Sequence, residues 1–319
     1  MNNWPKFGTF LQKILPAVRR ALGRSGWAVL ILTACHKDST PPPPPQRTFA
    51  VNGLVRELEP DGKTVVIRHE AISNYMAAMT MPFEVRDPGE LRGLKPGDAI
   101  SFHLVVTSNE GWIEGVTQRP KPPEPSPPPP GVQISRAVEP LDEGDMLPDC
   151  HFTNELGQPV NLAQYKGGVL AFTFFFTTCP FPNFCPRLTA NFSEAAAQLR
   201  QMPDAPPRWQ LLSITFDPAN DTPPRLLAYA KNAHYDPAHW SFLTGDIIQT
   251  SELADQFGEN FWTEGGSISH NLRTVVVDAR GRVRKIYQGN KWTSADLVQE
   301  ILKPESSGKK TAGRDSVEP

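Results

Sequence analysis

The stretch AFTFFFTTCPFPNFCPRLTANF, residues 171–192, contains an apolar run, a cysteine-bearing loop and the start of a helix. The nearly continuous apolar run is expected of a central strand that is covered on both faces. The loop holds Cys179 and Cys185, and Pro186 suits the first turn of the helix that follows. The residues alone leave three roles open for these thiols: a structural disulfide, a redox pair or a pair of metal ligands.

The segments around this loop alternate between strand and helix patterns. A second apolar run covers residues 209–217, and residues 221–233 predict a helix opened by a capping Asp-Thr pair. Residues 273–287 predict a hairpin, and residues 293–303 a capped terminal helix. This order, with cysteines just before the first long helix, is the thioredoxin arrangement. We therefore predict an α/β thioredoxin-like domain over residues 138–303.

Proline-rich tracts divide the rest of the chain. They predict a tether at residues 35–47 and a linker at residues 119–137, and neither can form a core. Between them, five short β-type runs separated by turn sequences predict an all-β domain at residues 48–118. So small a domain favours a closed or nearly closed barrel of the OB type. The polar residues 304–319 are predicted to form a disordered tail.

The N-terminus predicts export. Basic residues precede a short apolar run, residues 27–34, which is far below the roughly 20 residues that a membrane-spanning helix needs. The run ends in Leu32-Thr33-Ala34-Cys35, which resembles a bacterial lipoprotein signal. That resemblance implies a signal peptide at residues 1–34, a lipid on Cys35 and a membrane-anchored protein facing the periplasm. The alternative is a signal peptide of another type with an incidental cysteine.

Composition excludes some functions. The formal net charge is only -2, from 32 basic and 34 acidic residues, so nothing indicates a nucleic-acid partner. Four cysteines are too few for a disulfide-stapled scaffold, so each is considered individually. Cys150 falls where thioredoxin-like folds normally have an apolar core residue, and we expect a buried, inert thiol there.

The predicted barrel concentrates methionine. Of the six methionines in the chain, Met76, Met79 and Met81 lie close together. Met79 and Met81 are two residues apart on a predicted strand and so face the same side. The neighbouring strand is expected to end at His69. One imidazole and two thioethers form a soft ligand set suited to Cu(I) or Ag(I), although methionine is also an adaptable core residue.

The segments HEAISNYMAAMTMPFEV and LKPGDAISF resemble the periplasmic copper-binding barrels of the CusF type, over about residues 50–117. The resemblance implies that His69, Met79 and Met81 bind copper. In that family a tryptophan can cap the metal with its ring face. Here the corresponding residue is Met76, beside Tyr75, and Met76 is either a fourth ligand or a lid.

The cysteine spacing departs from that of thioredoxin. A redox pair at a helix start is normally separated by two residues, whereas five separate Cys179 from Cys185. The longer loop can still close a disulfide, but it moves Cys179 away from the helix and weakens that activation. A trigonal Cu(I) site needs a third ligand beside two thiolates. The candidate is His270, in a Gly-rich loop that enters a strand.

Four segments together resemble the SCO/SenC family of copper-delivery proteins over about residues 140–302: FFFTTCPFPNFCPRLT, SITFDPANDTPPRLLAYA, FLTGD and SISHNLRTVVVDARG. The resemblance implies that Cys179, Cys185 and His270 bind copper, although the family typically has three residues between its cysteines. Asp217 matches an acidic position near the family's site, and we expect a structural or supporting role for it.

The resemblance implies a membrane-tethered copper chaperone for cytochrome c oxidase assembly. Its partner would be the oxidase subunit that carries the copper site, and it would be a binding protein, with thiol-disulfide oxidoreductase activity left open. Two alternatives remain: a thiol-disulfide oxidoreductase that uses Cys179 and Cys185 to reduce target cysteines, and a copper-tolerance buffer. His270 separates the copper chaperone from the oxidoreductase, because copper binding requires this residue and thiol exchange does not.

Overall fold

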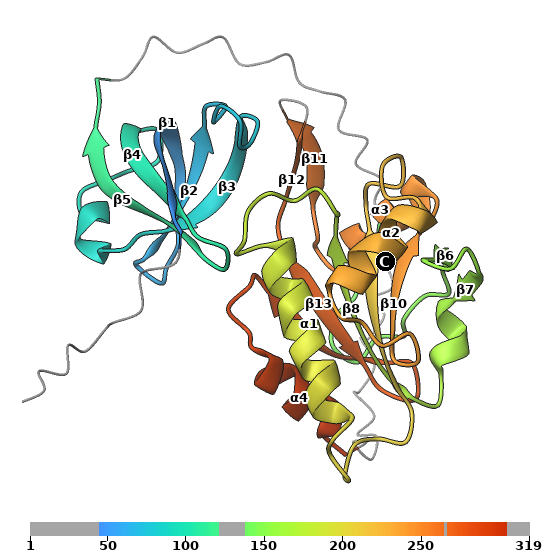
Figure 1. Cartoon of the computed structure of the whole chain (residues 1–319). Coiled ribbons are helices and arrows are strands. Elements are labelled where there is room, and N and C mark those ends of the chain that lie inside the picture. Colours follow the sequence, from blue (N-terminus) through green and yellow to red (C-terminus); the bar gives the residue numbers. More distant parts are fainter. Residues whose placement is uncertain (1–44, 121–137, 265–266, 305–319) are drawn as a thin grey trace, which may run out of the picture. The chain divides into compact units, whose positions relative to one another are not determined.

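The computed structural model describes residues 45–120, 138–264 and 267–304. The predicted signal peptide, Cys35, nearly all of the tether and linker, and the tail lie outside the described residues. The described residues form a small β domain and an α/β domain, as predicted (Figure 1). Within these ranges, none of the helices has the length and apolar character that a membrane span requires.

The β domain is a five-stranded antiparallel sheet with the order β3-β2-β1-β4-β5. Its strands are β1 (Arg47–Leu58), β2 (Thr64–His69), β3 (Met79–Glu84), β4 (Ala99–Val106) and β5 (Gly111–Gln118). The sheet nearly closes on itself, because Val85 forms a parallel bridge with Ile113 just beyond β3. The N–H of Arg86 donates to the carbonyl of Ile113 at 2.9 Å, so the outer strands are joined. The predicted barrel is confirmed.

Alternation along the strands places the barrel core. In β3, the side chains of Met79, Met81 and Phe83 are buried, while those between them are partly exposed. Gly53 in β1 lies where a side chain would clash with the neighbouring strand, since a Cβ there would lie 2.4 Å from Cγ2 of Ile67. A short 3-10 helix (Pro88–Leu91) follows β3 and is capped by the Asp87 carboxylate, which accepts from the N–H of Gly89.

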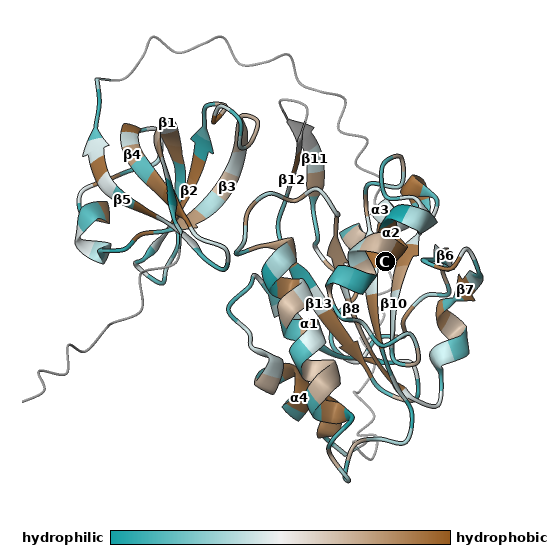
Figure 2. Cartoon of the chain, viewed as in Figure 1, coloured by the Kyte–Doolittle hydropathy of each residue, from teal (hydrophilic) through white to brown (hydrophobic). Residues whose placement is uncertain are grey.

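The α/β domain is built on a seven-stranded sheet with the order β14-β13-β8-β9-β10-β6-β7. Its strands are β6 (His151–Asn154), β7 (Pro159–Asn161), β8 (Val169–Phe175), β9 (Trp209–Thr215), β10 (Trp240–Thr244), β13 (Arg273–Val277) and β14 (Val283–Gln288). β8, β9 and β10 are parallel, and β13 joins β8 antiparallel. Every residue of β8 is buried, and Figure 2 shows the apolar character of this central region.

The helices are α1 (Cys185–Leu199), α2 (Pro223–Asn232), α3 (Ile247–Gln256) and α4 (Ser294–Leu302). α1 and α4 lie side by side and both contact β8 (Figure 1). α1 buries a stripe of apolar residues that includes Leu188, Phe192 and Leu199. The N-terminus of α4 carries a capping box made by Thr293 and Asp296, as predicted. At α2, Thr222 holds the N-cap position, but its side chain makes no capping hydrogen bond.

His270 belongs to a strand rather than to the predicted loop. β11 (Phe261–Glu264) and β12 (Ser267–His270) form an antiparallel hairpin, in which Phe261 pairs with His270. β12 leads through two residues into β13. The prediction of a loop was wrong at His270, because the Gly-Gly sequence before it favours an irregular loop, whereas Ser267–His270 pairs with Phe261–Glu264.

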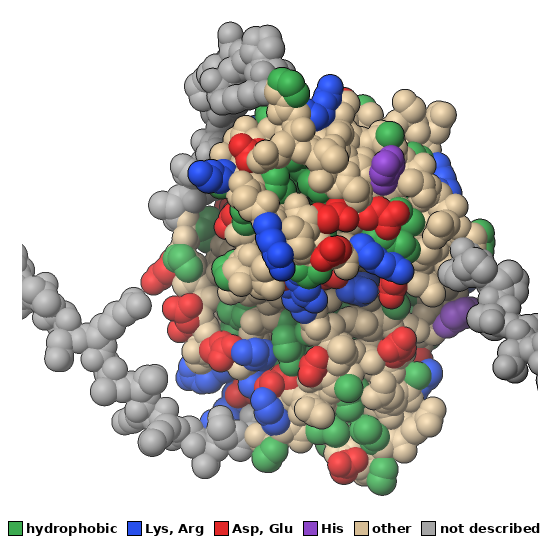
Figure 3. Space-filling model, turned by 90° about the vertical axis from the view of Figure 1, so that its left-hand side faces the viewer, with side chains coloured by type: hydrophobic (Ala, Val, Ile, Leu, Met, Phe, Trp, Pro, Cys, Tyr) green, Lys and Arg blue, Asp and Glu red, His purple; other side chains and the backbone are tan. Residues whose placement is uncertain are grey.

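The charged side chains are mixed in sign. Figure 3 shows acidic and basic residues interspersed over one face, without a broad area of a single sign on that face. This distribution agrees with the formal net charge of -2.

Candidate metal sites

Three elements bring two thiols and an imidazole together. Cys179 lies in the loop after β8, Cys185 is the first residue of α1, and His270 ends β12. One ligand atom from each lies within 4.8 Å of the other two. Sγ of Cys185 is 3.8 Å from Nε2 of His270. Cys185 and His270 are buried and Cys179 is partly exposed, so the cluster is open on the side of Cys179.

Both thiols of the cluster are free, and their pKa values differ. A hydrogen bond from Cys185 is the main cause that lowers the pKa of Cys179 to about 5, and His270 adds to it against the effect of burial. Burial and the neighbouring Cys179 raise the pKa of Cys185 well above its usual value. Cys179 is therefore the thiolate at neutral pH. This activation comes mainly from the side chains of Cys185 and His270, and the backbone N–H of Cys185 at the start of α1 adds to it.

Glu259 orients the imidazole. Its Oε1 lies 2.9 Å from Nδ1 of His270, and the carbonyl oxygen of Asn271 lies 2.5 Å from the same nitrogen. Two acceptors keep a proton on Nδ1 and direct Nε2 to the thiols. Burial alone would lower the pKa of His270, but Cys179 and Glu259 raise it to about 9. Burial raises the pKa of Glu259.

Sequence reasoning missed Glu259. It lies beyond α3 in the stretch QFGENFW, and its contact with His270 depends on the β11–β12 hairpin. The sequence signal was weak, one acidic residue between Phe257 and Phe261, although Glu259 itself is fully buried, with an exposed fraction of 0%. A buried carboxylate needs a partner.

Aromatic rings surround the same imidazole. The rings of Phe176, Phe184 and Phe216 meet His270 at near-perpendicular or steep angles, with centroids 5.7, 6.1 and 4.7 Å away. These apolar walls limit access of water to Nε2. They also fix the ring plane, so that the imidazole is held in place before any metal binds.

The predicted barrel site is also assembled. His69 in β2 pairs directly with Met79 in β3, and Met81 is opposite Ile67, two residues along the same face. His69, Met79 and Met81 are all buried. Nδ1 of His69 lies 2.7 Å from the carbonyl oxygen of Glu70, so Nε2 is the nitrogen suited to a metal. The expected neighbourhood of His69 and the two methionines is confirmed.

Met76 joins the methionine cluster, whereas Tyr75 does not. Met76 is buried, and it lines one pocket with Met79 and Met81. Tyr75 stacks on Phe49 with ring centroids 4.7 Å apart and planes 10° apart. Met76 therefore lies beside the methionine pair, and the choice between a fourth ligand and a lid stays a prediction.

Cys150 is buried and free, as expected, and burial raises its pKa to about 11. Such a thiol is unreactive at neutral pH. It is not part of the cluster formed by Cys179, Cys185 and His270.

The acidic residues near the site have different roles. Asp217 accepts from the amide of Asn220 at 3.0 Å, which is a local structural role. The buried carboxylate is Asp221, which accepts from Thr177 and Thr215. Because Thr177 lies two residues before Cys179, Asp221 fixes the start of the cysteine loop. The expected capping role of Asp221 is wrong, since these inward hydrogen bonds replace a helix cap.

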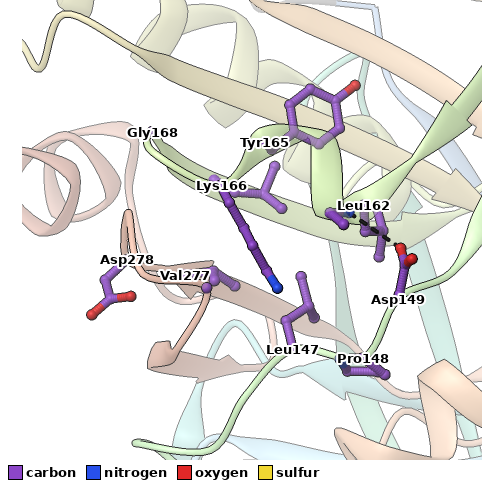
Figure 4. Close-up of a pocket in the computed structure, with 12 residues that line it drawn as sticks. Leu147, Pro148, Asp149, Leu162, Tyr165, Lys166, Gly168, Val277 and Asp278 are labelled. Carbon is purple, nitrogen blue, oxygen red and sulfur yellow. Dashed lines mark hydrogen bonds between the residues drawn. The ribbon is translucent and has the colours of Figure 1, made fainter.

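A separate small pocket has no ligand set of this kind. It is lined by Leu147, Lys166 and Asp278 among others, and Figure 4 shows Lys166 extending across it. The Asp278 carboxylate accepts from the N–H groups of Arg280 and Arg282. These hydrogen bonds stabilise the β13–β14 turn.

Comparison with known sequences identifies the α/β domain. The model of the SCO1/SenC family matches residues 139–304, slightly more than half of the chain. The chain belongs to the SCO1/SenC family. The model of the copper binding periplasmic protein CusF matches residues 48–118, which are the five-stranded barrel.

Individual members of the SCO1/SenC family are distant in sequence. The chain is 30% identical over 163 residues to the SCO1 protein homolog of Bacillus subtilis, covering 49% of this chain and 80% of that protein. It is 28% identical over 182 residues to a SCO2-like protein of Rickettsia typhi, covering 54% and 78%.

Solved structures of the family resemble the α/β domain. A SCO1/SenC family lipoprotein from Bacillus anthracis is 25% identical, with a TM-score of 0.44 over 53% of this chain and 96% of that one. BsSco, described as a member of the Sco family of cytochrome c oxidase assembly proteins, is 28% identical, with a TM-score of 0.44 over 50% and 94%.

Proposed function

We propose that this SCO1/SenC-family protein is an exported copper chaperone that supplies copper for cytochrome c oxidase assembly. The convergence of Cys179, Cys185 and His270 within 4.8 Å carries the proposal. Two thiolates and one imidazole suit copper and are a poor set for magnesium or calcium. A relative supports the link to cytochrome c oxidase assembly, because BsSco is described as a member of the Sco family of cytochrome c oxidase assembly proteins.

The protonation of the site suits metal capture. Cys179 is a thiolate at neutral pH, so it can take the first bond to copper without losing a proton. Cys185 keeps its proton until copper arrives and then releases it. Glu259 holds the imidazole so that Nε2 faces the thiols. Copper therefore meets a site that is already arranged, with one open side at Cys179.

The barrel supplies a second copper site of different strength. His69, Met79 and Met81 are neutral ligands, which hold Cu(I) but less tightly than a pair of thiolates. Copper captured by the barrel should therefore pass to the C-terminal site. The linker permits the domains to meet: its proline-rich tract, residues 119–132, has about 14 residues that at ~3.1 Å each span roughly 43 Å. Tethering of this kind can raise the effective concentration to about millimolar.

The anchoring part of the proposal rests on Cys35. A lipid on this residue, after removal of residues 1–34, would hold the protein at the membrane with both copper sites on the periplasmic side. The match of residues 48–118 to a periplasmic copper-binding protein supports this location. The partner would be the oxidase subunit that carries the copper site.

A thiol-disulfide oxidoreductase is the second candidate function. The observation in its favour is the pKa of about 5 for the partly exposed Cys179, beside a second thiol that could resolve a mixed disulfide. His270 separates the two functions less cleanly than the sequence suggests, because it also contributes to the lowered pKa of Cys179. The discriminating experiment must therefore measure copper binding itself.

The experiment measures copper content and spectra of the full chain carrying Cys35→Ser, with variants of each site. We expect two coppers per chain, one of which gives thiolate-to-Cu(II) charge-transfer absorption when Cu(II) is loaded. Cys179→Ser or Cys185→Ser should abolish that band, and His270→Ala should weaken binding and shift it. Cys150→Ser is the control and should change neither. Copper binding by His270→Ala with unchanged strength and spectrum would refute the ligand set and favour the oxidoreductase.

A further inference from the structure

The five residues between the two cysteines have contacts that copper binding does not require. Phe181 and Asn183 lie in this loop, yet their exposed fractions are only 2% and 5%. A loop this close to the surface would normally leave such side chains in water, and a buried amide needs hydrogen-bond partners. The partners of both side chains are in the barrel.

Asn183 binds the backbone of Gly111, the first residue of β5. Its Nδ2 donates to the carbonyl oxygen of Gly111 at 2.7 Å, and its Oδ1 accepts from the N–H of Gly111 at 3.0 Å. The side chain thus satisfies both backbone groups of one residue, as a neighbouring strand would. The carbonyl of Asn183 accepts from the amide of Asn290 at 2.7 Å, which fixes the loop from its own domain.

Phe181 packs against the barrel core. Its ring lies edge-on to Phe83 of β3, with centroids 5.7 Å apart, and edge-on to Phe184 at 5.4 Å. Gly111 is required at this contact, since a Cβ there would lie 2.5 Å from Cε2 of Phe181. The fit is therefore specific to a residue without a side chain.

Two polar contacts surround this packing. The hydroxyl of Tyr75 donates to the carbonyl oxygen of Pro180 at 3.1 Å, which adds a third loop residue to the contact. Lys291, just before α4, forms an ion pair with Asp61 in the β1–β2 turn. The contact thus has an apolar centre with hydrogen bonds and a charge pair around it.

The two candidate metal sites share the pocket beside this contact. Met76, Met79 and Met81 line it from the barrel, and Cys179, Phe181 and His270 line it from the α/β domain. The pocket therefore contains two thioethers proposed to hold copper and the thiolate proposed to receive it. No other protein surface is needed to bring the two ligand sets together.

We propose that residues 180–184 are a docking loop for the barrel, and that the docked chain passes Cu(I) directly from Met79 and Met81 to Cys179. The transfer rests on the proposed function, whereas docking can be tested without copper. The step is a ligand exchange: the copper–thioether bonds to Met79 and Met81 break as copper–thiolate bonds to Cys179 and Cys185 form, and the protons that Cys185 and Nε2 of His270 lose on binding pass to solvent. Copper remains Cu(I), so the step needs neither an oxidant nor a reductant.

The docking test measures rotational tumbling by ¹⁵N relaxation in the metal-free, reduced full chain carrying Cys35→Ser. We expect amides of the barrel and of the α/β domain to report one correlation time. The double substitution Phe181→Ala and Asn183→Ala should give the barrel a shorter one. Gly111→Ala should do the same from the opposite side of the contact, which guards against a fold defect in either domain. Asn232→Ala, at an exposed asparagine of α2, is the matched control.

The transfer test follows ultraviolet thiolate-to-Cu(I) absorption after less than one equivalent of Cu(I) is mixed with the same chains. We expect a slow phase whose rate does not depend on protein concentration, and at least a tenfold slower phase in the Phe181→Ala/Asn183→Ala chain. Met79→Ala/Met81→Ala should remove this phase. An equal rate in the loop variant would overturn direct transfer.

The two proposals fail separately. Independent tumbling of the domains in a chain that binds copper at both sites would overturn the docking loop and leave the chaperone function standing. Joint tumbling that depends on Phe181 and Asn183, in a chain that binds no copper, would support docking and overturn the proposed function.

Discussion

Glu259 and His270 form a buried pair in which Oε1 lies 2.9 Å from Nδ1. Both side chains are almost completely removed from solvent, so the carboxylate is a fixed acceptor rather than a transient one. It keeps a proton on Nδ1 and turns Nε2 toward Cys179 and Cys185. The pair links the hairpin that carries His270 to the end of α3.

Glu259→Gln should therefore weaken copper binding without removing a ligand. Supporting partners of metal-bound histidines are commonly worth about 10–100-fold in affinity. We expect a loss in that range, measured by competition with a Cu(I) chelator, and a charge-transfer band that remains present but shifted. Glu139→Gln, at an exposed glutamate, is the matched control. Unchanged affinity in Glu259→Gln would show that Asn271 alone orients the ring.

Cys179 should react with iodoacetamide far below the pH range of an ordinary thiol. Its pKa of about 5 means that the thiolate is already present at pH 6, whereas an unperturbed cysteine at pKa 9 would be protonated. In the metal-free reduced chain, the rate of alkylation at Cys179 should fall as the pH drops through about 5. Cys185 should stay slow throughout, because its pKa is raised and it is buried. Mass spectrometry of the labelled peptides measures both.

The position of the two thiols, the shared face of Met79 and Met81 and the order of the elements could be predicted from the sequence, because each depends on local pattern. The apolar run, Pro186 and the stripe of α1 together place Cys185 at a helix start. Period-two alternation puts Met79 and Met81 on one face of a strand. These features need no knowledge of distant contacts.

The missed features all depend on contacts between distant residues. Glu259 contacts His270 because the β11–β12 hairpin brings them together, and the Gly-Gly sequence favoured a loop there instead of a hairpin. The position of Asp221 before Thr222 and Pro223 predicts a helix cap. Its buried carboxylate instead accepts hydrogen bonds from Thr177 and Thr215, which lie elsewhere in the sequence. The contact of Asn183 with Gly111 joins residues 72 positions apart, and no local pattern indicates it.

Asp221→Asn should destabilise the α/β domain and disturb the cysteine loop. The carboxylate is fully buried and accepts from the Thr177 N–H at 3.0 Å and the Thr215 hydroxyl at 2.6 Å. The side-chain amide of asparagine would point its NH2 group, a donor, at one of these donors and leave the buried groups unpaired. We therefore expect a loss of about 3 kcal/mol in the free energy of unfolding. Asp217→Asn, four residues away with a carboxylate that accepts from the amide of Asn220, should change it by less than about 0.5 kcal/mol. Urea denaturation of the metal-free chains measures the difference.

Cys35→Ser should leave the precursor unprocessed or unlipidated while both folded domains stay intact. The expectation follows from the Leu-Thr-Ala-Cys sequence, in which the cysteine would receive the lipid. Labelling with a fatty-acid probe and partition into detergent measure it in cells. If the variant keeps wild-type labelling and membrane partition, Cys35 is an incidental cysteine and another type of signal directs export.

Copper placed on the barrel should move to the α/β domain and not return. The barrel offers one imidazole and two thioethers, all neutral, whereas the α/β site offers a thiolate, a second thiol that ionises on binding, and an imidazole. The charge of the thiolates makes the second site the stronger one for a soft cation. The measurement compares the Cu(I) affinities of two full chains, one with Met79→Ala/Met81→Ala and one with Cys179→Ser/Cys185→Ser. We expect the chain that keeps its cysteines to bind at least tenfold more tightly, a difference of about 1.4 kcal/mol. Tighter binding by the chain that keeps its methionines would reverse the direction, and the barrel would then store copper taken from the thiol site.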